Sequence, residues 1–447
     1  MLLEFTVANF RSFKEPMTFS MVAAHLTARN KELDVHNLIS VSPKLDALRS
    51  AAVYGANASG KSNLVKAVKF MRAFALGSSK ESQADDPIAV ENFRLSTETE
   101  GNPSHFEVTF RADGVRYRYG FEVNSTRVQS EWLFHTPNER ERMLFVREGD
   151  SFSLSSVFKE GKALEDRTRP NALFLSVAAQ FNGEISQRLL RWFRNLRIIS
   201  GLNDFGFRAF TLTGFQNGTL KPAILDLVTA LDLGISSIEV ERNTMSEELL
   251  PKEFPTELKK FLVEHGADQH SVSTFHTKFG PDASPVGFEA FDMSSHESDG
   301  TNKIFSLSGP LIDVLSHGRV LVVDELDARL HPLITASIIN LFNSPKTNPN
   351  NAQIIFTTHD TNLLNNRVFR RDQVWFVEKD RLAATTLYSL AEYRAGEGRV
   401  RNDASFEKDY IAGRYGAIPF IGGIEQILRD PPREQANSAQ ENHAGVQ

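Results

Sequence analysis

The residues with the clearest chemistry lie in a glycine-rich stretch, YGANASGKSNL, from Tyr54 to Leu64. Gly55, Gly60, Lys61 and Ser62 occupy the fixed positions of the phosphate-binding pattern G-x-x-x-x-G-K-[ST]. Glycines let the backbone wrap around a phosphate, and free N–H groups at the start of the next helix point toward it. Lys61 is expected to reach the β- and γ-phosphates, and the Ser62 hydroxyl to coordinate Mg²⁺. The other loop residues expected to line the nucleotide are Ala56, Asn57, Ala58, Ser59 and Asn63.

A second group of chemically useful residues follows the apolar run LVV at Leu321–Val323. Asp324 and Glu325 come directly after it, at the carboxyl end of the predicted strand. A phosphate-loop enzyme needs one carboxylate for the Mg²⁺ shell and another to orient and deprotonate the attacking water. His359 ends the next predicted strand, and it is either a γ-phosphate contact or an ordinary loop histidine.

Three further positions have two interpretations each. The segment Ser298–Thr301, SDGT, stands at a predicted helix start, where it is a capping turn or an anion site for ATP held by a second subunit. Asp327 is a subunit contact or the cap of the next helix, and Arg11 is a nucleotide contact or an exposed turn residue. His331 precedes a proline and is expected to be structural.

Predicted strands and helices place these residues. SAAVY before the phosphate loop is typical of a buried strand, and SNLVKAVKFMRAF after it of an amphipathic helix. LLEFTVA at residues 2–8 predicts a strand, and Asp113-Gly114 predicts a hairpin turn between alternating strands. A helix is expected from about Gly300, followed by the LVV strand, a helix from about residue 334, and another buried strand before His359.

Composition limits the classes of protein. Hydrophobic residues are 41% and charged residues 24% of 447, which is ordinary for a globular chain. No apolar run is long enough for a membrane span, and the start MLLEFTVANF lacks the basic stretch of a secretory signal. The absence of cysteine excludes disulfides, thiolate zinc sites and cysteine catalysis. We expect a cytoplasmic protein without a membrane partner.

A net charge of −6 means that nucleic-acid binding requires a local basic patch. The segment 185–200 predicts a basic amphipathic helix that runs into a strand. Its arginines could face nucleic acid, although a solvated or salt-bridged face is favoured; they are Arg188, Arg191, Arg194 and Arg197. The segment 244–266 is expected to be helical and broken by prolines, and 430–447 to be a disordered tail.

The order of these parts resembles an ABC-type ATPase head of the SMC and OLD-nuclease kind. More closely, ESDGT, DELDARLHP, FTTHDTNLL, RRDQVWFVEKD and YIAGRYGAIPF resemble the bacterial RloA/AbiLi-like ATPases linked to phage defence. The resemblance implies an α/β P-loop NTPase fold, with a mixed β-sheet lobe and a largely helical insertion. It covers residues 1–75 and about 270–420 well, and 76–270 only in outline.

The resemblance also divides the chain. Residues 1–75 would form the N-terminal half of the head, 76–134 its β-rich part, 135–270 a mostly helical insertion for a partner or sensor, and 271–429 the C-terminal half. The resemblance implies that Lys61 and Ser62 bind phosphates and Mg²⁺, that Asp324 is the Walker B aspartate, and that Glu325 is the catalytic base. His359 would be the switch histidine, and Arg11 would contact the nucleotide. Ser298 and Gly300 would act as the signature loop in trans, and Asp327 as a dimer-facing residue. SDGT departs from the usual Leu-Ser-Gly-Gly-Gln-like signature.

The expected function is an ATPase that dimerises or oligomerises around ATP and Mg²⁺ and controls a separate effector in anti-phage defence. Residues 360–447 are too few for the Toprim domain of OLD nucleases, so the resemblance implies a co-encoded Toprim or RloB-like nuclease. One alternative is an SMC- or RecF-like ATPase that clamps DNA. Another is a scaffold that binds nucleotide without turnover and holds a toxin inactive.

Overall fold

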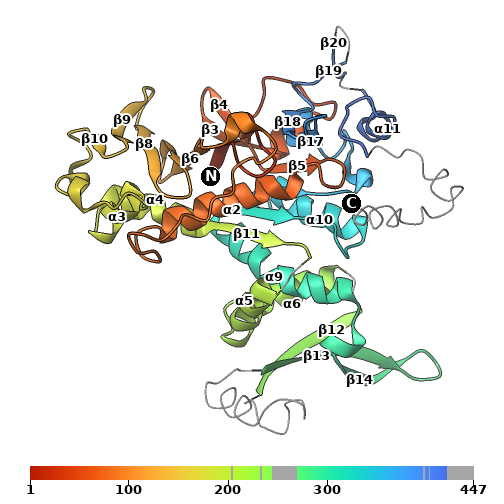
Figure 1. The fold of residues 1–447 in the computed structure, drawn as a ribbon. Coiled ribbons are helices and arrows are strands. Elements are labelled where there is room, and N and C mark those ends of the chain that lie inside the picture. The colour runs from red at the N-terminus through yellow and green to blue at the C-terminus, as the bar shows by residue number, and fades with distance from the viewer. Residues whose placement is uncertain (203–204, 232–233, 244–268, 396–397, 402, 420–447) are drawn as a thin grey trace, which may run out of the picture.

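The computed structural model describes residues 1–202, 205–231, 234–243, 269–395, 398–401 and 403–419. Figure 1 shows a wide upper body that holds two large sheets, and a narrower lower lobe beneath it. The phosphate loop lies in the body, between β5 and α2. The lower lobe is built from segments on both sides of residues 244–268, so the chain enters the lobe and returns to the body.

The nucleotide-loop sheet has six strands in the order β11-β15-β16-β5-β17-β18. The first five strands are parallel, and β18 is antiparallel to β17. Apolar, largely buried strands suit this position, since a parallel sheet is covered on both faces. The strands are β5 (Ser50–Tyr54), β11 (Leu196–Ser200), β15 (Val320–Asp324), β16 (Gln353–Thr357), β17 (Val374–Lys379) and β18 (Thr385–Ser389).

Helices cover both faces of this sheet. Helix α2 (Lys61–Gly77) contributes Leu64, Val68 and Met71 to the larger apolar core, which it shares with the second sheet. Helix α10 (Pro332–Asn343) packs into the other core, on the opposite face. The carboxyl ends of the parallel strands meet at one edge, which is where open parallel sheets place their ligand sites.

The second sheet is an antiparallel meander with the strand order β10-β9-β8-β7-β6-β1-β2. Its strands are β1 (Leu2–Ala8), β2 (Met17–Ser20), β6 (Ser104–Ala112), β7 (Val115–Val123), β8 (Val128–Thr136), β9 (Arg142–Glu148) and β10 (Ser151–Leu154). Asp113 and Gly114 join β6 to β7 with φ angles of 47° and 82°, so the predicted hairpin is confirmed.

The lower lobe packs helices on a three-stranded sheet in the order β12-β13-β14. Its apolar core includes Phe215, Ile224, Val272 and Phe305. Its elements are α5 (Phe205–Gln216), α6 (Lys221–Ala230), β12 (Ile235–Asn243), β13 (Gln269–Phe279), β14 (Pro285–Asp292), α8 (Met293–His296) and α9 (Asp299–His317). Helix α9 also contacts β15, so it connects the lobe to the nucleotide-loop sheet.

Shorter elements complete the described chain. They are α1 (Leu33–His36), β3 (Leu38–Ser42), β4 (Leu45–Leu48), α3 (Phe174–Gln180), α4 (Glu184–Asn195), β19 (Arg394–Ala395), β20 (Gly398–Arg399) and α11 (Phe406–Ile411). Among the described helices, none is both long and apolar enough to cross a membrane.

The segment 135–270 contains more strand than its expected helical character suggests. Strands β9 and β10 extend the antiparallel meander, β11 joins the nucleotide-loop sheet, and β12 joins the lower lobe. Helix α4 runs directly into β11, as expected for 185–200, and Arg188 and Arg197 lie in ion pairs with Asp113 and Asp313. The expected broken helix at 244–266 and the expected tail at 430–447 lie outside the described residues.

Candidate nucleotide site

The phosphate loop is closed around two glycines that no other residue could replace without displacing its neighbours. A Cβ at Gly55 would lie 2.3 Å from the Val377 carbonyl oxygen, and one at Gly60 would lie 2.4 Å from Thr385 Oγ1. Gly60 also has φ of 119°, which favours glycine. Thr385 Oγ1 donates to the Ser59 carbonyl at 2.9 Å, so β18 is hydrogen-bonded to the phosphate loop.

Lys61 is buried, and its ammonium lies inside the loop. Its Nζ donates to the carbonyls of Gly55 at 2.7 Å and Ala56 at 3.1 Å. Burial lowers the pKa of Lys61 to about 8, and the negative charges of Glu325 and Asp324 oppose that shift. A bound phosphate would raise this pKa again, because it would supply an opposite charge.

Two features of the loop fit an anion. Ser59 Oγ lies beside Gly55, is buried and has no hydrogen-bond partner among the described residues. The N–H groups at the start of α2 follow directly after Gly60. A phosphate oxygen would satisfy both kinds of group, so the loop fits a nucleotide phosphate.

A chain of hydrogen bonds joins the phosphate loop to the acidic strand end. Ser62 Oγ donates to Asp324 Oδ1 at 3.2 Å, and Thr357 Oγ1 donates to the same oxygen at 2.7 Å. Thr357 Oγ1 in turn accepts the Glu325 N–H at 2.7 Å. The ends of β15 and β16 and the start of α2 therefore meet at one point.

The Ser62 hydroxyl and the Asp324 carboxylate fit a Mg²⁺ site. Mg²⁺ is held by few protein ligands when a phosphate supplies the others. The described residues contain no cluster of three or more His, Cys, Asp or Glu side chains with metal-binding geometry. Ser62 and Asp324 would supply two protein oxygens to such an ion, and phosphate oxygens and water would complete its shell.

Glu325 has a left-handed backbone with φ of 56°. A residue other than glycine in this region costs about 1–3 kcal/mol and persists where surrounding contacts hold it. Gly201 N donates to the Asp324 carbonyl at 2.5 Å, and a Cβ on Gly201 would lie 1.8 Å from the Glu325 carbonyl oxygen. The loop after β11 therefore presses directly against the turn that carries Glu325.

Lys303 holds the same turn from the opposite direction. This buried lysine of α9 donates from Nζ to the carbonyls of Leu326 at 2.9 Å, Glu325 at 3.4 Å, and Ala328. Its ammonium thus caps a turn whose carbonyls converge, and it connects the N-terminal part of α9 to the acidic strand end. Sequence reasoning overlooked Lys303, Gly201 and Thr357, because these contacts join segments more than twenty residues apart.

His359 follows β16, and Asp327 lies in the turn after β15. The His359 N–H donates to Asp327 Oδ2 at 3.3 Å. Burial, and then the positive charge of Lys61, lower the pKa of the His359 imidazole, which favours its neutral form. Asp327 does not cap α10; His331 does, since its Nδ1 accepts the Leu333 N–H at 3.2 Å.

The SDGT turn forms the start of α9, as expected. Ser298 Oγ caps the helix by accepting the Thr301 N–H at 3.1 Å. Ser298 and Asp299 are exposed, and a Cβ at Gly300 would lie 2.9 Å from the Arg329 carbonyl oxygen. None of the hydrogen bonds of this turn within the described chain reaches residues 55–63.

Arg11 lies in a left-handed turn and pairs with Glu91, both through its side chain and through its N–H, which donates to the Glu91 carbonyl at 2.8 Å. The neighbouring Ser12 accepts from Asn63 Nδ2 at 2.7 Å. The turn is therefore attached to the phosphate loop, and the arginine itself is held in an ion pair.

Comparisons with known proteins come from families and from solved structures. Residues 50–365, more than half of the chain, match the family described as "AAA domain, putative AbiEii toxin, Type IV TA system". No curated protein matches the chain.

Among solved structures, the chain is similar to SMC head domains. The SMC head domain from Thermotoga maritima shares 13% identity at a TM-score of 0.38, over 87% of this chain and 98% of that one. An SMC head bound to the winged-helix domain of ScpA shares 13% identity at a TM-score of 0.42, over 87% of this chain and 97% of that one. An SMC head with an extended coiled coil, bound to the C-terminal domain of ScpA from Pyrococcus furiosus, shares 12% identity at a TM-score of 0.36. The match covers 92% of this chain and 98% of that one.

Proposed function

Because the chain belongs to this AAA-domain family and has a P-loop ATPase fold, we propose that it binds ATP with Mg²⁺ and hydrolyses it. The observation that carries the proposal is the hydrogen-bonded chain from Ser62 through Asp324 and Thr357 to Glu325. It joins a phosphate loop to a metal-binding carboxylate and a candidate base, which are the parts that phosphoryl transfer to water needs.

Each residue has a distinct role in the proposed reaction. The loop N–H groups and Lys61 bind the β- and γ-phosphates, and Ser62 and Asp324 hold the metal. Bound Mg²⁺ would neutralise charge on the β- and γ-phosphate oxygens. Glu325 orients the attacking water and takes its proton, and neutral His359 contacts the γ-phosphate.

We also propose that the Ser298 turn completes the site of a second subunit. The turn offers the start of α9 to solvent, and in its own chain it makes no hydrogen bond to the phosphate loop. A helix N-terminus stabilises an anion, so it would bind the γ-phosphate presented by another copy. Asp327 would then lie near the subunit contact. ATP would join two subunits, and hydrolysis would release them.

The proposed biological role is control of a separate effector in anti-phage defence. The family description, which names a toxin and a type IV TA system, supports a role beside a partner protein. Lys303 supplies a physical route, since it couples α9, which would contact the second subunit, to the turn that carries Glu325.

Turnover measured against protein concentration tests the proposal, together with Glu325→Gln examined with ATP on a sizing column. We expect turnover per subunit to rise with concentration and the variant to assemble when ATP is added. Tight ATP binding with no turnover would instead favour a scaffold that binds nucleotide without hydrolysis. Turnover independent of concentration, with an unchanged size, would contradict the shared site.

A further inference from the structure

The nucleotide-loop sheet ends in an open strand. β11 pairs on one side with β15, and no described strand pairs with its other side. Gly201 N–H donates to the Asp324 carbonyl, which fixes the alternation of the ladder. The peptide groups of Arg197 and Ile199 therefore face β15, and those of Ile198 and Ser200 face outward. An open edge of this kind can pair with another strand.

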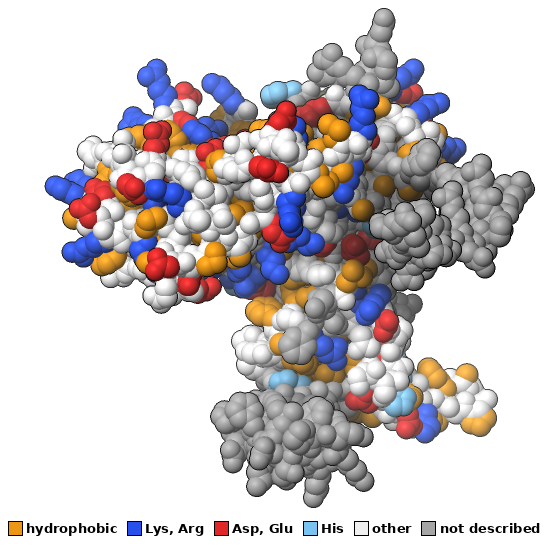
Figure 2. Space-filling view, viewed as in Figure 1, with side chains coloured by type: hydrophobic (Ala, Val, Ile, Leu, Met, Phe, Trp, Pro, Cys, Tyr) orange, Lys and Arg blue, Asp and Glu red, His pale blue; other side chains and the backbone are white. Residues whose placement is uncertain are grey.

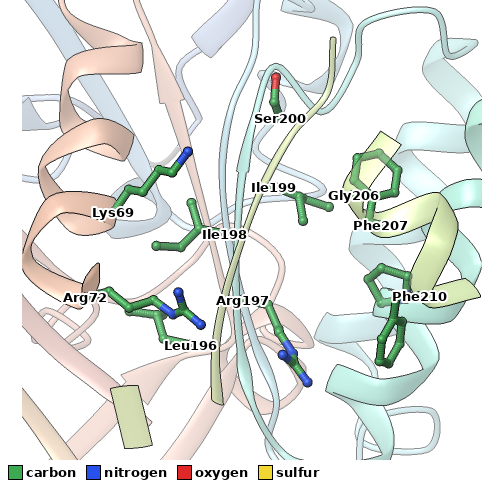
Figure 3. Close-up of a pocket in the computed structure, with 11 residues that line it drawn as sticks. Lys69, Arg72, Leu196, Arg197, Ile198, Ile199, Ser200, Gly206, Phe207 and Phe210 are labelled. Atoms are coloured by element: carbon green, nitrogen blue, oxygen red, sulfur yellow. The ribbon is translucent and has the colours of Figure 1, made fainter. Parts of the chain in front are cut away.

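A groove of about 480 Å³ follows this edge. Figure 3 shows Lys69 and Arg72 of α2 on one side of β11, and Phe207 and Phe210 of α5 on the other. Ile198 faces the α2 side and Ile199 the α5 side, so both walls are partly apolar. In Figure 2, blue and orange side chains lie next to each other at the neck between the body and the lower lobe.

The charge around the groove is positive. Lys69, Arg72 and Arg197 line it, and none of the described residues that line it is acidic. Asp313 pairs with Arg197 at 3.2 Å but also pairs with Arg319, so one carboxylate serves two guanidinium groups. Burial and the nearby charge of Arg197 lower the pKa of Arg72, which means that this cation would gain from a negative neighbour.

We propose that the β11 edge docks an extended, acidic segment of a partner polypeptide by adding a strand to the sheet. Main-chain hydrogen bonds to Ile198 and Ser200 would supply affinity, and acidic side chains beside Lys69 and Arg72 would supply selectivity. A second copy of this chain does not fit, because edge-to-edge pairing would bring these cations against their own copies. A nucleic acid would not supply the regular main-chain hydrogen bonds that the outward peptide groups of Ile198 and Ser200 can accept from an added strand.

The docked segment would lie one strand away from the catalytic turn. Ser200 pairs with Asp324 in the sheet register, and Gly201 touches the carbonyl of Glu325. A partner strand on β11 would therefore act on the proposed hydrolysis. Only this consequence rests on the proposed ATPase function, since docking itself is measured without nucleotide.

The test uses end-blocked heptapeptides as probes. One alternates valine and glutamate, a second alternates valine and lysine, and a third is the acidic peptide with alternate amides N-methylated. We expect the full-length protein to bind the acidic peptide alone. Binding should slow hydrogen exchange in residues 196–201 and change ATP turnover in a separate assay. Lys69→Glu should weaken binding about fivefold, whereas Lys66→Glu, an exposed lysine of the same helix outside the groove, should not.

Three results would overturn the docking proposal. The first is no binding of the acidic peptide at millimolar concentration. The second is equal binding of the acidic, basic and N-methylated peptides. The third is a single-stranded oligonucleotide that binds the groove and loses affinity in Lys69→Glu, since that would assign the groove to nucleic acid. Docking without any change in turnover would retain the interaction surface and remove its link to the ATPase.

Discussion

Gly201→Ala is expected to disable hydrolysis while leaving nucleotide binding largely intact. The new Cβ would lie 1.8 Å from the Glu325 carbonyl oxygen, whereas real Cβ atoms essentially never approach closer than 3.0 Å. The turn or the loop after β11 must therefore move by at least the difference, 3.0 − 1.8 = 1.2 Å. The contacting atoms are backbone on both sides, so no flexible side chain can absorb this shift.

A misplacement of about 1 Å in a catalytic group costs on the order of 100-fold in rate. We therefore expect kcat to fall about 100-fold, which corresponds to about 2.7 kcal/mol at the transition state. The dissociation constant for ATP should change by only a few-fold, because Gly55, Gly60 and Lys61 do not touch Gly201. The assay is steady-state phosphate release at saturating ATP, combined with equilibrium binding of ATP in a Glu325→Gln background.

Gly206→Ala is the matched control, since a Cβ at Gly206 meets no atom of the described residues within 4 Å. Gly206 lies in α5, where alanine also favours the helix. This variant should retain wild-type turnover. A Gly201→Ala protein that melts at the wild-type temperature and keeps kcat within threefold would refute the claim that this loop positions Glu325.

Three other perturbations test the contacts of the same site. Thr357→Val removes the hydroxyl that bridges Asp324 and the Glu325 N–H. Each lost hydrogen bond costs about 1 kcal/mol, so kcat should fall about 10- to 30-fold. An unchanged rate of phosphate release would show that the bridge is dispensable. Lys303→Met leaves the carbonyls of the Glu325 turn without their donor, and kcat should fall at least tenfold, with partial recovery in Lys303→Arg; equal thermal stability but full turnover would contradict this role. Lys61 has a pKa of about 8 and must be protonated to bind phosphate. The affinity for ATP, measured by calorimetry in Mg²⁺-free buffer, should therefore be constant below about pH 8 and decrease about tenfold per pH unit above it. An affinity that is unchanged up to about pH 9.5 would show that Lys61 stays charged in the free protein.

The sequence alone predicts those parts of the site whose residues lie close together in the chain. The phosphate loop and the LVVDE strand end combine residue types with a periodicity that specifies strand, turn and helix, so their elements were predicted correctly. A capping turn was one of the two interpretations of Ser298–Thr301, and the structure shows Ser298 as the cap of α9. These motifs act through backbone geometry within a few residues, which a sequence displays directly.

The remaining contacts depend on packing between distant segments. Lys303 looks like an ordinary surface lysine of a helix, and only the position of α9 against β15 buries its ammonium among carbonyls. Gly201 looks like a turn glycine, and its importance arises from the pairing of β11 with β15. That pairing places a strand from the segment 135–270 in the nucleotide-loop sheet, and no periodicity within this segment indicates which sheet it joins.

Subunit mixing tests the shared site most directly. Lys61→Ala removes phosphate binding, and Ser298→Asp retains a good helix cap while placing a negative charge where the γ-phosphate of the other subunit would bind. Each variant alone should be inactive. If the site is shared, half of the dimers in an equal mixture are mixed and each has one intact site, so turnover should recover to roughly a quarter of wild type. A mixture as inactive as its components, with mixed dimers shown to form, would contradict a site completed by Ser298 of a second subunit.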